Sequence, residues 1–196
     1  MRRFMTAIRT RPHLKWILLS TMAFVLGVTL YYRCMWLGNR EAVLRSVDDR
    51  LSAAADLVPM LLPKDFHDRA LGPASVSFDE ELLNRRRINE FVEIEGLRYA
   101  QTLVRFEGKF YFSAPTVSAK EAKDRRSWYF YPYDDGPEVL ERVYDTGRAA
   151  FLSYRDRWGG YRSLCRRFFS PGGVPYLVLV DMAAESVDGL LARSLP

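Results

Sequence analysis

The stretch LRYAQTLVRFEGKFYFSA, residues 97–114, decides the fold of this chain. Two runs rich in aromatic and β-branched residues flank the pair Glu107–Gly108, which is a turn signal for a β-hairpin. The segments before it have a helical period of apolar residues, and here the period changes to that of strands. The stretch therefore predicts two antiparallel strands joined at residues 107–108.

Three more strand patterns follow, in RAAFLSYRD (148–156), YRSLCRRFF (161–169) and VPYLVLVDM (174–182). Gly159–Gly160 predicts the turn between the first two, and SPGGV (170–174) predicts the turn between the second and third. With the hairpin, they predict a sheet of five antiparallel strands.

The helices are predicted from their boundaries. Ser77 and Glu80 have the spacing of a capping box, and Gly96 is a typical helix end. A short helix is predicted between Pro137 and Gly147, and a last one from residue 184. We predict an α+β fold, with the helices gathered on one face of the five-stranded antiparallel sheet.

A heptad seam precedes these elements. Its apolar residues are spaced by three and four, and they are Leu44, Val47, Leu51, Ala54, Val58 and Leu61. Pro59 interrupts the pattern. The seam would pair with a second copy of the chain, giving a homodimer, or pack on the chain's own sheet, or do each at a different end of the helix; the pattern does not separate these alternatives.

The N-terminal segment has the pattern of a membrane anchor. Residues 16–32 include no charged residue, which corresponds to roughly 26 Å of helix. Residues 1–37 carry a net charge of +6, and the rest of the chain carries −1. Because most of the basic residues precede the apolar run, the N-terminus is expected in the cytoplasm.

We therefore divide the chain into a basic cytoplasmic flank (1–15), a transmembrane helix (16–36) and an extracytoplasmic domain (38–196). That domain comprises a long helix (38–62), a core of helix and sheet (77–182) and a terminal helix (184–196). The chain is expected to be a single-pass protein of the inner (cytoplasmic) membrane, with its domain periplasmic or extracellular and the lipid bilayer as a partner.

Composition also argues against several classes of protein. The near-neutral domain lacks the basic bias of nucleic-acid-binding proteins, so no nucleic acid is expected as a partner. The two histidines, His13 and His67, lie on opposite sides of the anchor, and no cluster has the spacing of metal ligands. Asp134–Asp135 is typical of a turn. No enzyme activity, metal or cofactor is expected.

Four strings, in this order and behind an anchor, resemble the single Cache domain, a PAS-like extracytoplasmic sensor module of bacterial chemotaxis receptors, sensor histidine kinases and diguanylate cyclases. They are LRYAQTLVRFEGKFYFSA, YFYPYDDGPE, FLSYRDRWGGYRS and SPGGVPYLVLVDM, and the resemblance covers residues 40–190. It implies a sensor that passes its ligand state to a signalling output beyond residue 196 or on a partner. The alternative is an anchored interaction or assembly module without a small ligand.

Candidate ligand residues follow from residue chemistry and from the resemblance. Arg162 would bind a carboxylate or phosphate in a bidentate manner, Asp181 would accept from an amine, and aromatic residues would line the pocket. The resemblance implies that Asp181 and the loop around Tyr131 border this pocket. Arg126, Trp128 and Tyr129 resemble the amine-recognition motif of double Cache sensors. The candidates for binding a small polar or anionic ligand are Arg162, Asp181, Tyr131, Tyr133, Tyr154, Tyr161, Arg126 and Trp128.

Overall fold

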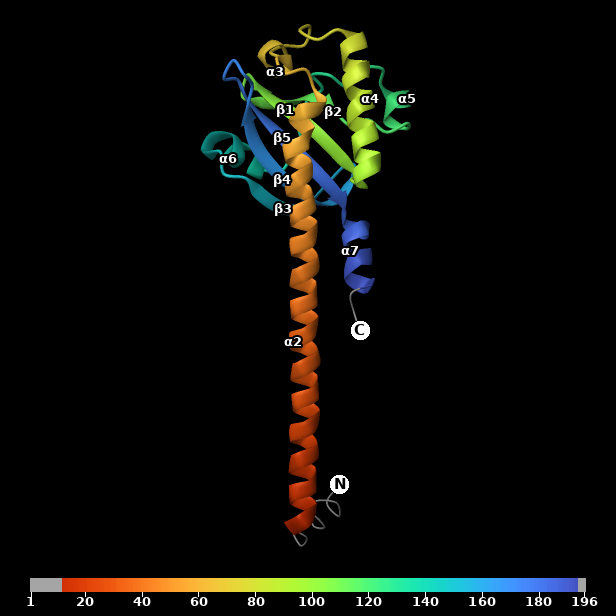
Figure 1. Ribbon diagram of the computed structural model, residues 1–196, viewed down its shortest axis with the longest axis vertical. Coiled ribbons are helices and arrows are strands. Elements are labelled where there is room, and N and C mark those ends of the chain that lie inside the picture. The colour runs from red at the N-terminus through yellow and green to blue at the C-terminus, as the bar shows by residue number, and fades with distance from the viewer. Residues whose placement is uncertain (1–11, 194–196) are drawn as a thin grey trace.

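A computed structural model describes residues 12–193 of the chain. Most of the predicted cytoplasmic flank and the last three residues of the predicted terminal helix therefore lie outside the described residues. The described part comprises one sheet, a long helix that projects from it, and shorter helices around it (Figure 1).

The long helix α2 runs without interruption from Pro12 to Leu57, about 69 Å at 1.5 Å per residue. The side chains of residues 16–32 are all exposed, and of the described helices this one alone is long and apolar enough to cross a membrane. Proline lacks a backbone N–H, and at Pro59 the α-helix has given way to the 3₁₀ turn η1, Val58–Leu61. The predicted anchor and the predicted long helix thus form one continuous rod.

The five-stranded antiparallel sheet confirms the predicted α+β fold. Its strands are β1 (Tyr99–Phe106), β2 (Lys109–Pro115), β3 (Ala150–Asp156), β4 (Gly159–Phe169) and β5 (Pro175–Ala183), in the order β2-β1-β5-β4-β3. The turn between β1 and β2 lies at Glu107 and Gly108, both with positive φ (49° and 77°), as a tight hairpin requires.

The helices confirm the predicted boundaries. Helix α4 spans Phe78–Glu95; the Ser77 hydroxyl accepts from the Glu80 N–H at 3.2 Å, and Gly96 ends the helix with φ 61°. The others are α3 (Phe66–Arg69), α5 (Glu121–Asp124), α6 (Val139–Thr146) and α7 (Ala184–Arg193), which lies beside α2 (Figure 1).

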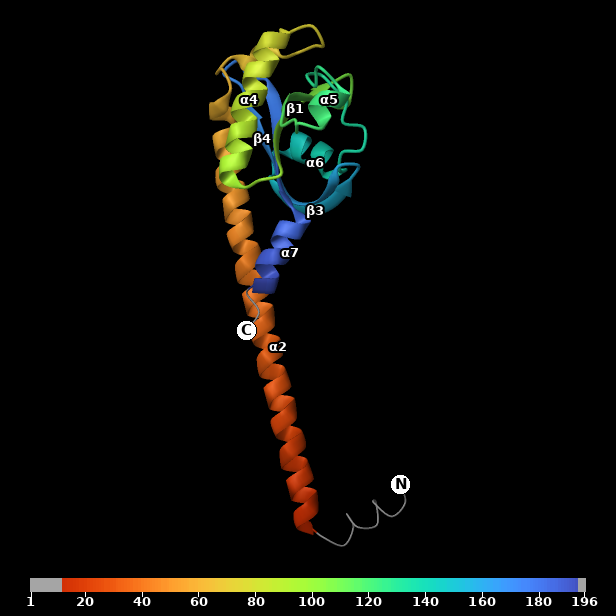
Figure 2. The same ribbon diagram turned by 90° about the vertical axis from the view of Figure 1, so that its right-hand side faces the viewer.

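The predicted gathering of the helices on one face of the sheet is wrong. Figure 2 shows α2 and α4 on one side of the sheet and α5 and α6 on the other. The reason lies in β5, where every side chain from Tyr176 to Met182 is buried, so that both faces need cover. The cover on the second face encloses a pocket.

The heptad seam packs inside the domain. Val47, Leu51, Ala54 and Val58 are at most 2% exposed and belong to the same core as Val178, Val180 and Met182 of the sheet. The alternative in which a second copy of the chain covers these four residues is therefore wrong. A homodimer is still predicted, but it would have to form through another surface.

Candidate ligand-binding site

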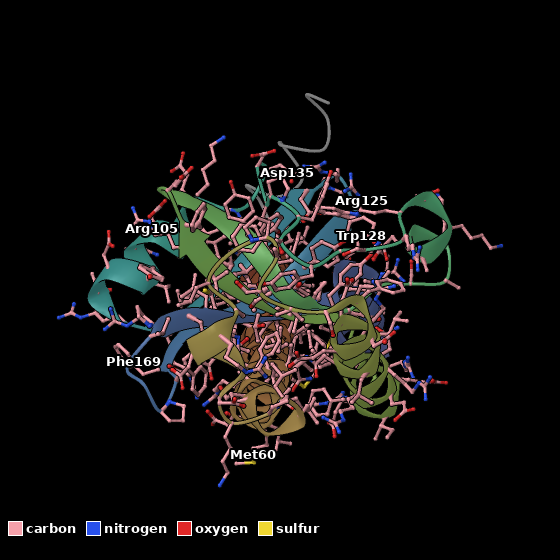
Figure 3. The ribbon with its side chains drawn as sticks, turned by 90° about the horizontal axis from the view of Figure 1, so that it is seen from above. Met60, Arg105, Arg125, Trp128, Asp135 and Phe169 are labelled. Atoms are coloured by element: carbon pink, nitrogen blue, oxygen red, sulfur yellow. The ribbon has the colours of Figure 1, made fainter. Side chains whose placement is uncertain are left out.

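A pocket lies on the face of the sheet that points away from α2. It is enclosed by β1, β5, the end of β2, the β3–β4 hairpin and the segment that carries α5. The lining residues are Tyr99, Gln101, Phe112, Pro115, Thr116, Glu121, Trp128, Tyr133, Asp156, Trp158 and Asp181. Seen from above, the labelled Trp128, Arg125 and Asp135 lie on the side opposite Met60 at the end of the long-helix rod (Figure 3).

Asp181 forms the floor of this pocket. It is 1% exposed and stands opposite Tyr99 on β1 and Ser163 on β4. Two side chains donate to its carboxyl group, Gln101 through Nε2 and Tyr154 through its hydroxyl, both at a long 3.3 Å. Burial raises the pKa of Asp181 to about 7, and the charge of Asp156 adds to this rise, whereas the hydrogen bond from Tyr154 opposes it.

The second carboxyl group, Asp156, organises the tip of the β3–β4 hairpin. Its Oδ1 accepts from the backbone N–H groups of Trp158 at 2.8 Å and Gly159 at 3.2 Å, and its Oδ2 accepts from the Tyr133 hydroxyl at 3.0 Å. Burial raises the pKa of Asp156 and, most strongly, those of the Tyr133 and Tyr154 phenols. Both phenols are therefore neutral donors at ordinary pH.

Glu121 belongs to the outer wall. Its carboxylate accepts from the Ser118 N–H at 2.7 Å and from the Tyr99 hydroxyl at 3.3 Å, and its backbone carbonyl accepts from Trp128 Nε1 at 3.2 Å. Ser118 in turn caps the Glu121 N–H at 3.3 Å. This capping box closes α5 over the pocket.

A buried ion pair fastens this wall to α4. The carboxylate of Glu81, 5% exposed, bonds Arg85 on the same helix, and it accepts from the Ser127 hydroxyl and from the Trp128 N–H, the last at 2.7 Å. The position of Trp128 is therefore tied to the helix that packs beside α2.

All the ionisable carboxyl and basic groups in the lining are of one kind, acidic. Three carboxyl groups face the pocket, and no lysine, arginine or histidine is among the lining residues. A pocket lined by one sign of charge concentrates ligands of the opposite sign. The geometry thus favours a cationic ligand group, whereas the sequence had suggested an anionic one as well.

Three of the eight candidates line the pocket: Asp181, Tyr133 and Trp128. Tyr154 lies behind them, bonded to Asp181 and 3.2 Å from the Tyr133 hydroxyl. Tyr161 packs edge-on against Tyr99, and its buried hydroxyl has no partner among residues 12–193.

Two candidates lie outside. The Tyr131 ring packs against Trp128 and carries the Arg125 guanidinium 4.3 Å from its centroid. Arg126 is exposed and stacks 4.5 Å over Phe78, and Tyr129 donates to the Gly72 carbonyl. Arg126, Trp128 and Tyr129 therefore do not converge on the pocket.

The placement of Arg162 corrects the prediction that it anchors the ligand. Its guanidinium forms a bidentate ion pair with Asp48 of α2, at 2.8 and 2.6 Å, on the other face of the sheet. Side chains alternate between faces along a strand, so Tyr161 and Ser163 share the face of Asp181 and Arg162 does not. Of the two neighbouring candidates Tyr161 and Arg162, only Tyr161 therefore lies on the face of the pocket.

Sequence reasoning missed Gln101, Glu121 and Asp156. Ser118 and Glu121 have capping-box spacing, which would have predicted a closed turn at α5. Gln101 is a polar residue inside an apolar strand. Asp156, two residues before Trp158, is typical of an Asx turn. None of these signals places the three residues around one pocket.

The pocket is narrow. Its free volume is about 20 Å³, enough for about one water molecule. A ligand the size of an amino acid therefore needs the segment that carries α5 to move outward.

A long N-terminal helix, a five-stranded antiparallel sheet and a pocket on the far face of that sheet define the PAS-like Cache class of fold. No model of a protein family matches the chain, and neither does any curated protein. Solved structures do share its fold, and they include sensor domains of a histidine kinase and of a chemoreceptor.

The sensor domain of the Vibrio cholerae histidine kinase DctB matches with a TM-score of 0.61 at 12% identity, over 84% of this chain and 60% of that one. The Campylobacter jejuni chemoreceptor Tlp3 with isoleucine bound matches with a TM-score of 0.53 at 13% identity, over 89% of this chain and 66% of that one. Its complex with L-valine gives 0.54 at 13% identity, with 89% and 67% covered. The chain thus spans about two thirds of these domains, and the likeness confirms the Cache resemblance at the level of the fold.

Proposed function

We propose that this chain is a membrane-anchored extracytoplasmic sensor whose pocket binds a small organic molecule through a protonated amine, with Asp181 as the counter-ion. One observation carries the proposal: a fully buried carboxyl group faces a cavity lined by no basic residue, and both of its hydrogen bonds are long. A buried carboxylate requires a cation or a proton. A protonated amine supplies the cation.

The structural neighbours support a ligand of this kind. The isoleucine and valine in the two Tlp3 complexes each carry an ammonium group. These neighbours are sensory domains, which also supports a role without catalysis.

The long helix supports the membrane arrangement. Its apolar residues 16–32 are exposed, and the basic charge lies mainly before them. We infer that the N-terminus lies in the cytoplasm and that the sheet domain lies outside the inner membrane. Ligand state would reach the membrane through α2, which carries the core seam and the ion pair to Arg162.

The small free volume of the cavity favours a second candidate, an anchored assembly module that binds a protein surface and no small ligand. With about 20 Å³ of free volume, the pocket is filled by its own side chains. The two proposed functions predict different results with small cations: the sensor should be stabilised by one, and the assembly module by none.

The test uses the full-length chain in lipid nanodiscs and measures thermal unfolding with a panel of amines, amino acids and organic acids. A ligand at a hundred times its dissociation constant stabilises the fold by about 2.7 kcal/mol. We expect shifts from amines and amino acids and none from acids lacking an amine. Asp181→Asn should remove the shift, whereas Asp188→Asn, on the exposed side of α7, should retain it.

Shifts from organic acids alone, or a full shift in Asp181→Asn, would contradict the cation site. No shift from any compound would make the assembly module the better account.

A further inference from the structure

The walls of the pocket offer mainly ring surface to a ligand, because three of their four polar tips are already hydrogen-bonded. Five of the lining residues are aromatic: Tyr99, Phe112, Trp128, Tyr133 and Trp158. The Tyr133 hydroxyl donates to Asp156, the Tyr99 hydroxyl donates to Glu121, and Trp128 Nε1 donates to the Glu121 carbonyl. What remains for a cationic ligand group is the faces and edges of the rings, because the indole N–H of Trp158 is a donor only.

Three of these rings form a single bent wall. The Phe112 centroid lies 4.9 Å from that of Tyr133 and 6.2 Å from that of Trp158, and Tyr133 and Trp158 are 5.9 Å apart. Their planes are inclined to one another by 35°, 81° and 52°, so they present surfaces in several directions. The guanidinium of Arg157 stacks 4.7 Å from the Trp158 ring and is itself paired with Asp135 at 2.7 Å.

The hydrogen-bond acceptors around this wall are few. Asp156 already accepts three hydrogen bonds, and the Glu121 carboxylate accepts two. Asp181 also accepts two hydrogen bonds, but both are long at 3.3 Å, whereas one of the two to Glu121 is 2.7 Å. A primary ammonium carries three N–H donors, and those that reach neither Asp181 nor another lining oxygen would face ring carbon and lose their hydration without compensation.

N-methyl groups remove this cost. They carry part of the positive charge of the ammonium, offer no unsatisfied donor, and are attracted to aromatic faces. A carboxylate nearby then acts as a counter-charge rather than as a hydrogen-bond partner.

We propose that the pocket selects molecules whose ammonium nitrogen is N-methylated, with Phe112, Tyr133 and Trp158 contacting the methyl groups and Asp181 balancing the charge. This inference rests on the proposed function, since it specifies the amine at the same site. Because the cavity is small, binding moves the segment Thr116–Trp128 outward. Residues 122–127 of that segment are exposed, and Glu121 joins it to the pocket through its contacts with Tyr99 and Trp128.

The test compares four probes that differ only in N-methylation: ethanolamine, N-methylethanolamine, N,N-dimethylethanolamine and choline. Binding to the full-length chain in nanodiscs is measured by calorimetry. The dissociation constant should fall by about tenfold or more from ethanolamine to choline, in line with a desolvated cation–π contact. The uncharged carbon analogue of choline, 3,3-dimethylbutan-1-ol, should bind much more weakly than choline.

Variants of the wall give a second measurement. Phe112→Leu and Trp158→Leu should each reduce the preference for choline over ethanolamine, whereas Phe169→Leu, at a residue 59% exposed on β4, should keep it. The probe series on the unchanged chain decides the question even where a wall variant does not fold.

The outcomes separate this inference from the proposed function. Equal or tighter binding of ethanolamine overturns the selection for N-methyl groups and leaves the amine sensor standing. Equal binding of the neutral analogue shows a merely apolar site and also overturns the selection. Failure of all four probes overturns it as well, and if no other amine binds through Asp181, the proposed function fails too.

Discussion

Replacing Asp181 by asparagine should change how the stability of the ligand-free domain depends on pH. In the native state the pKa of Asp181 is raised to about 7, against 3.8 as the ordinary value. The folded protein therefore binds more protons than the unfolded chain between about pH 4 and 7. The contribution of Asp181 is full below about pH 4, declines as pH rises, and is lost above about pH 7.

His67 contributes with the opposite sign. It is 4% exposed, stacks on Tyr176 at 3.6 Å, and burial lowers its pKa from 6.5 to about 3. The folded state thus binds fewer protons than the unfolded chain between about pH 3 and 6.5, and this contribution to stability is lost as pH falls. In the unchanged chain the two contributions largely cancel between pH 4 and 6.5.

Asp181→Asn removes one of these two opposing contributions. The free energy of unfolding of the variant, relative to the unchanged chain, should rise by up to about 1.4 kcal/mol per pH unit from pH 4 to 7 and then level off. The difference between the ordinary pKa of Asp181, 3.8, and its native-state pKa, about 7, limits the total gain in the free energy of unfolding. Between pH 4 and pH 8 this gain is at most on the order of 4 kcal/mol.

Denaturant unfolding in buffers from pH 4 to 8, followed by tryptophan fluorescence, measures this difference. The quantity compared is the free energy of unfolding of Asp181→Asn minus that of the unchanged chain. A difference that is constant with pH, or that is smaller at pH 8 than at pH 5, would refute the conclusion that Asp181 is a buried, titrating carboxyl group.

Three further outcomes are expected. Arg162→Ala should destabilise the domain by about 1–2 kcal/mol, because the half-buried ion pair with Asp48 is lost, and it should leave amine affinity unchanged. Loss of amine binding in a variant that still folds would instead place Arg162 at the ligand. Leu51→Ala should cost about 2–5 kcal/mol in chemical unfolding because Leu51 is fully buried in the domain core, and a variant that is fully stable but fails to self-associate would instead support the seam as a dimer contact. A reporter enzyme that is active only outside the cytoplasm, fused after Pro196, should be active, and an inactive but expressed fusion would reverse the membrane orientation.

The hairpin at residues 97–114 was predictable because the residues that determine it are adjacent in the sequence. Turn chemistry at Glu107–Gly108 and the aromatic and β-branched residues on either side are local features of the chain, and the same holds for the caps at Ser77 and Gly96. The site role of Asp181 was also predictable from the sequence, because a carboxyl group that ends a buried apolar run must meet a partner or a cavity.

The facing of β4 was not predictable in this way. Its sequence YRSLCRRFF has no clean alternation, and Arg162 is drawn to the helix face by Asp48, which is 114 residues away. The cover on the second face of the sheet depends likewise on tertiary structure. The segment after β2 folds back onto that strand, with the Phe112 N–H donating to the Tyr131 carbonyl at 3.0 Å, and so brings Trp128 and Tyr133 to the pocket.

The affinity of a protonated amine as a function of pH tests the central claim most directly. The probe is an amine from the panel that stays charged up to pH 9, titrated into the full-length chain between pH 5 and 9. If the cation binds the ionised Asp181, the dissociation constant should fall about tenfold per pH unit up to about pH 7 and then stay constant, and Asp181→Asn should bind weakly throughout. An affinity that is independent of pH in the unchanged chain, or that is highest in acid, would contradict the assignment of Asp181 as the counter-ion.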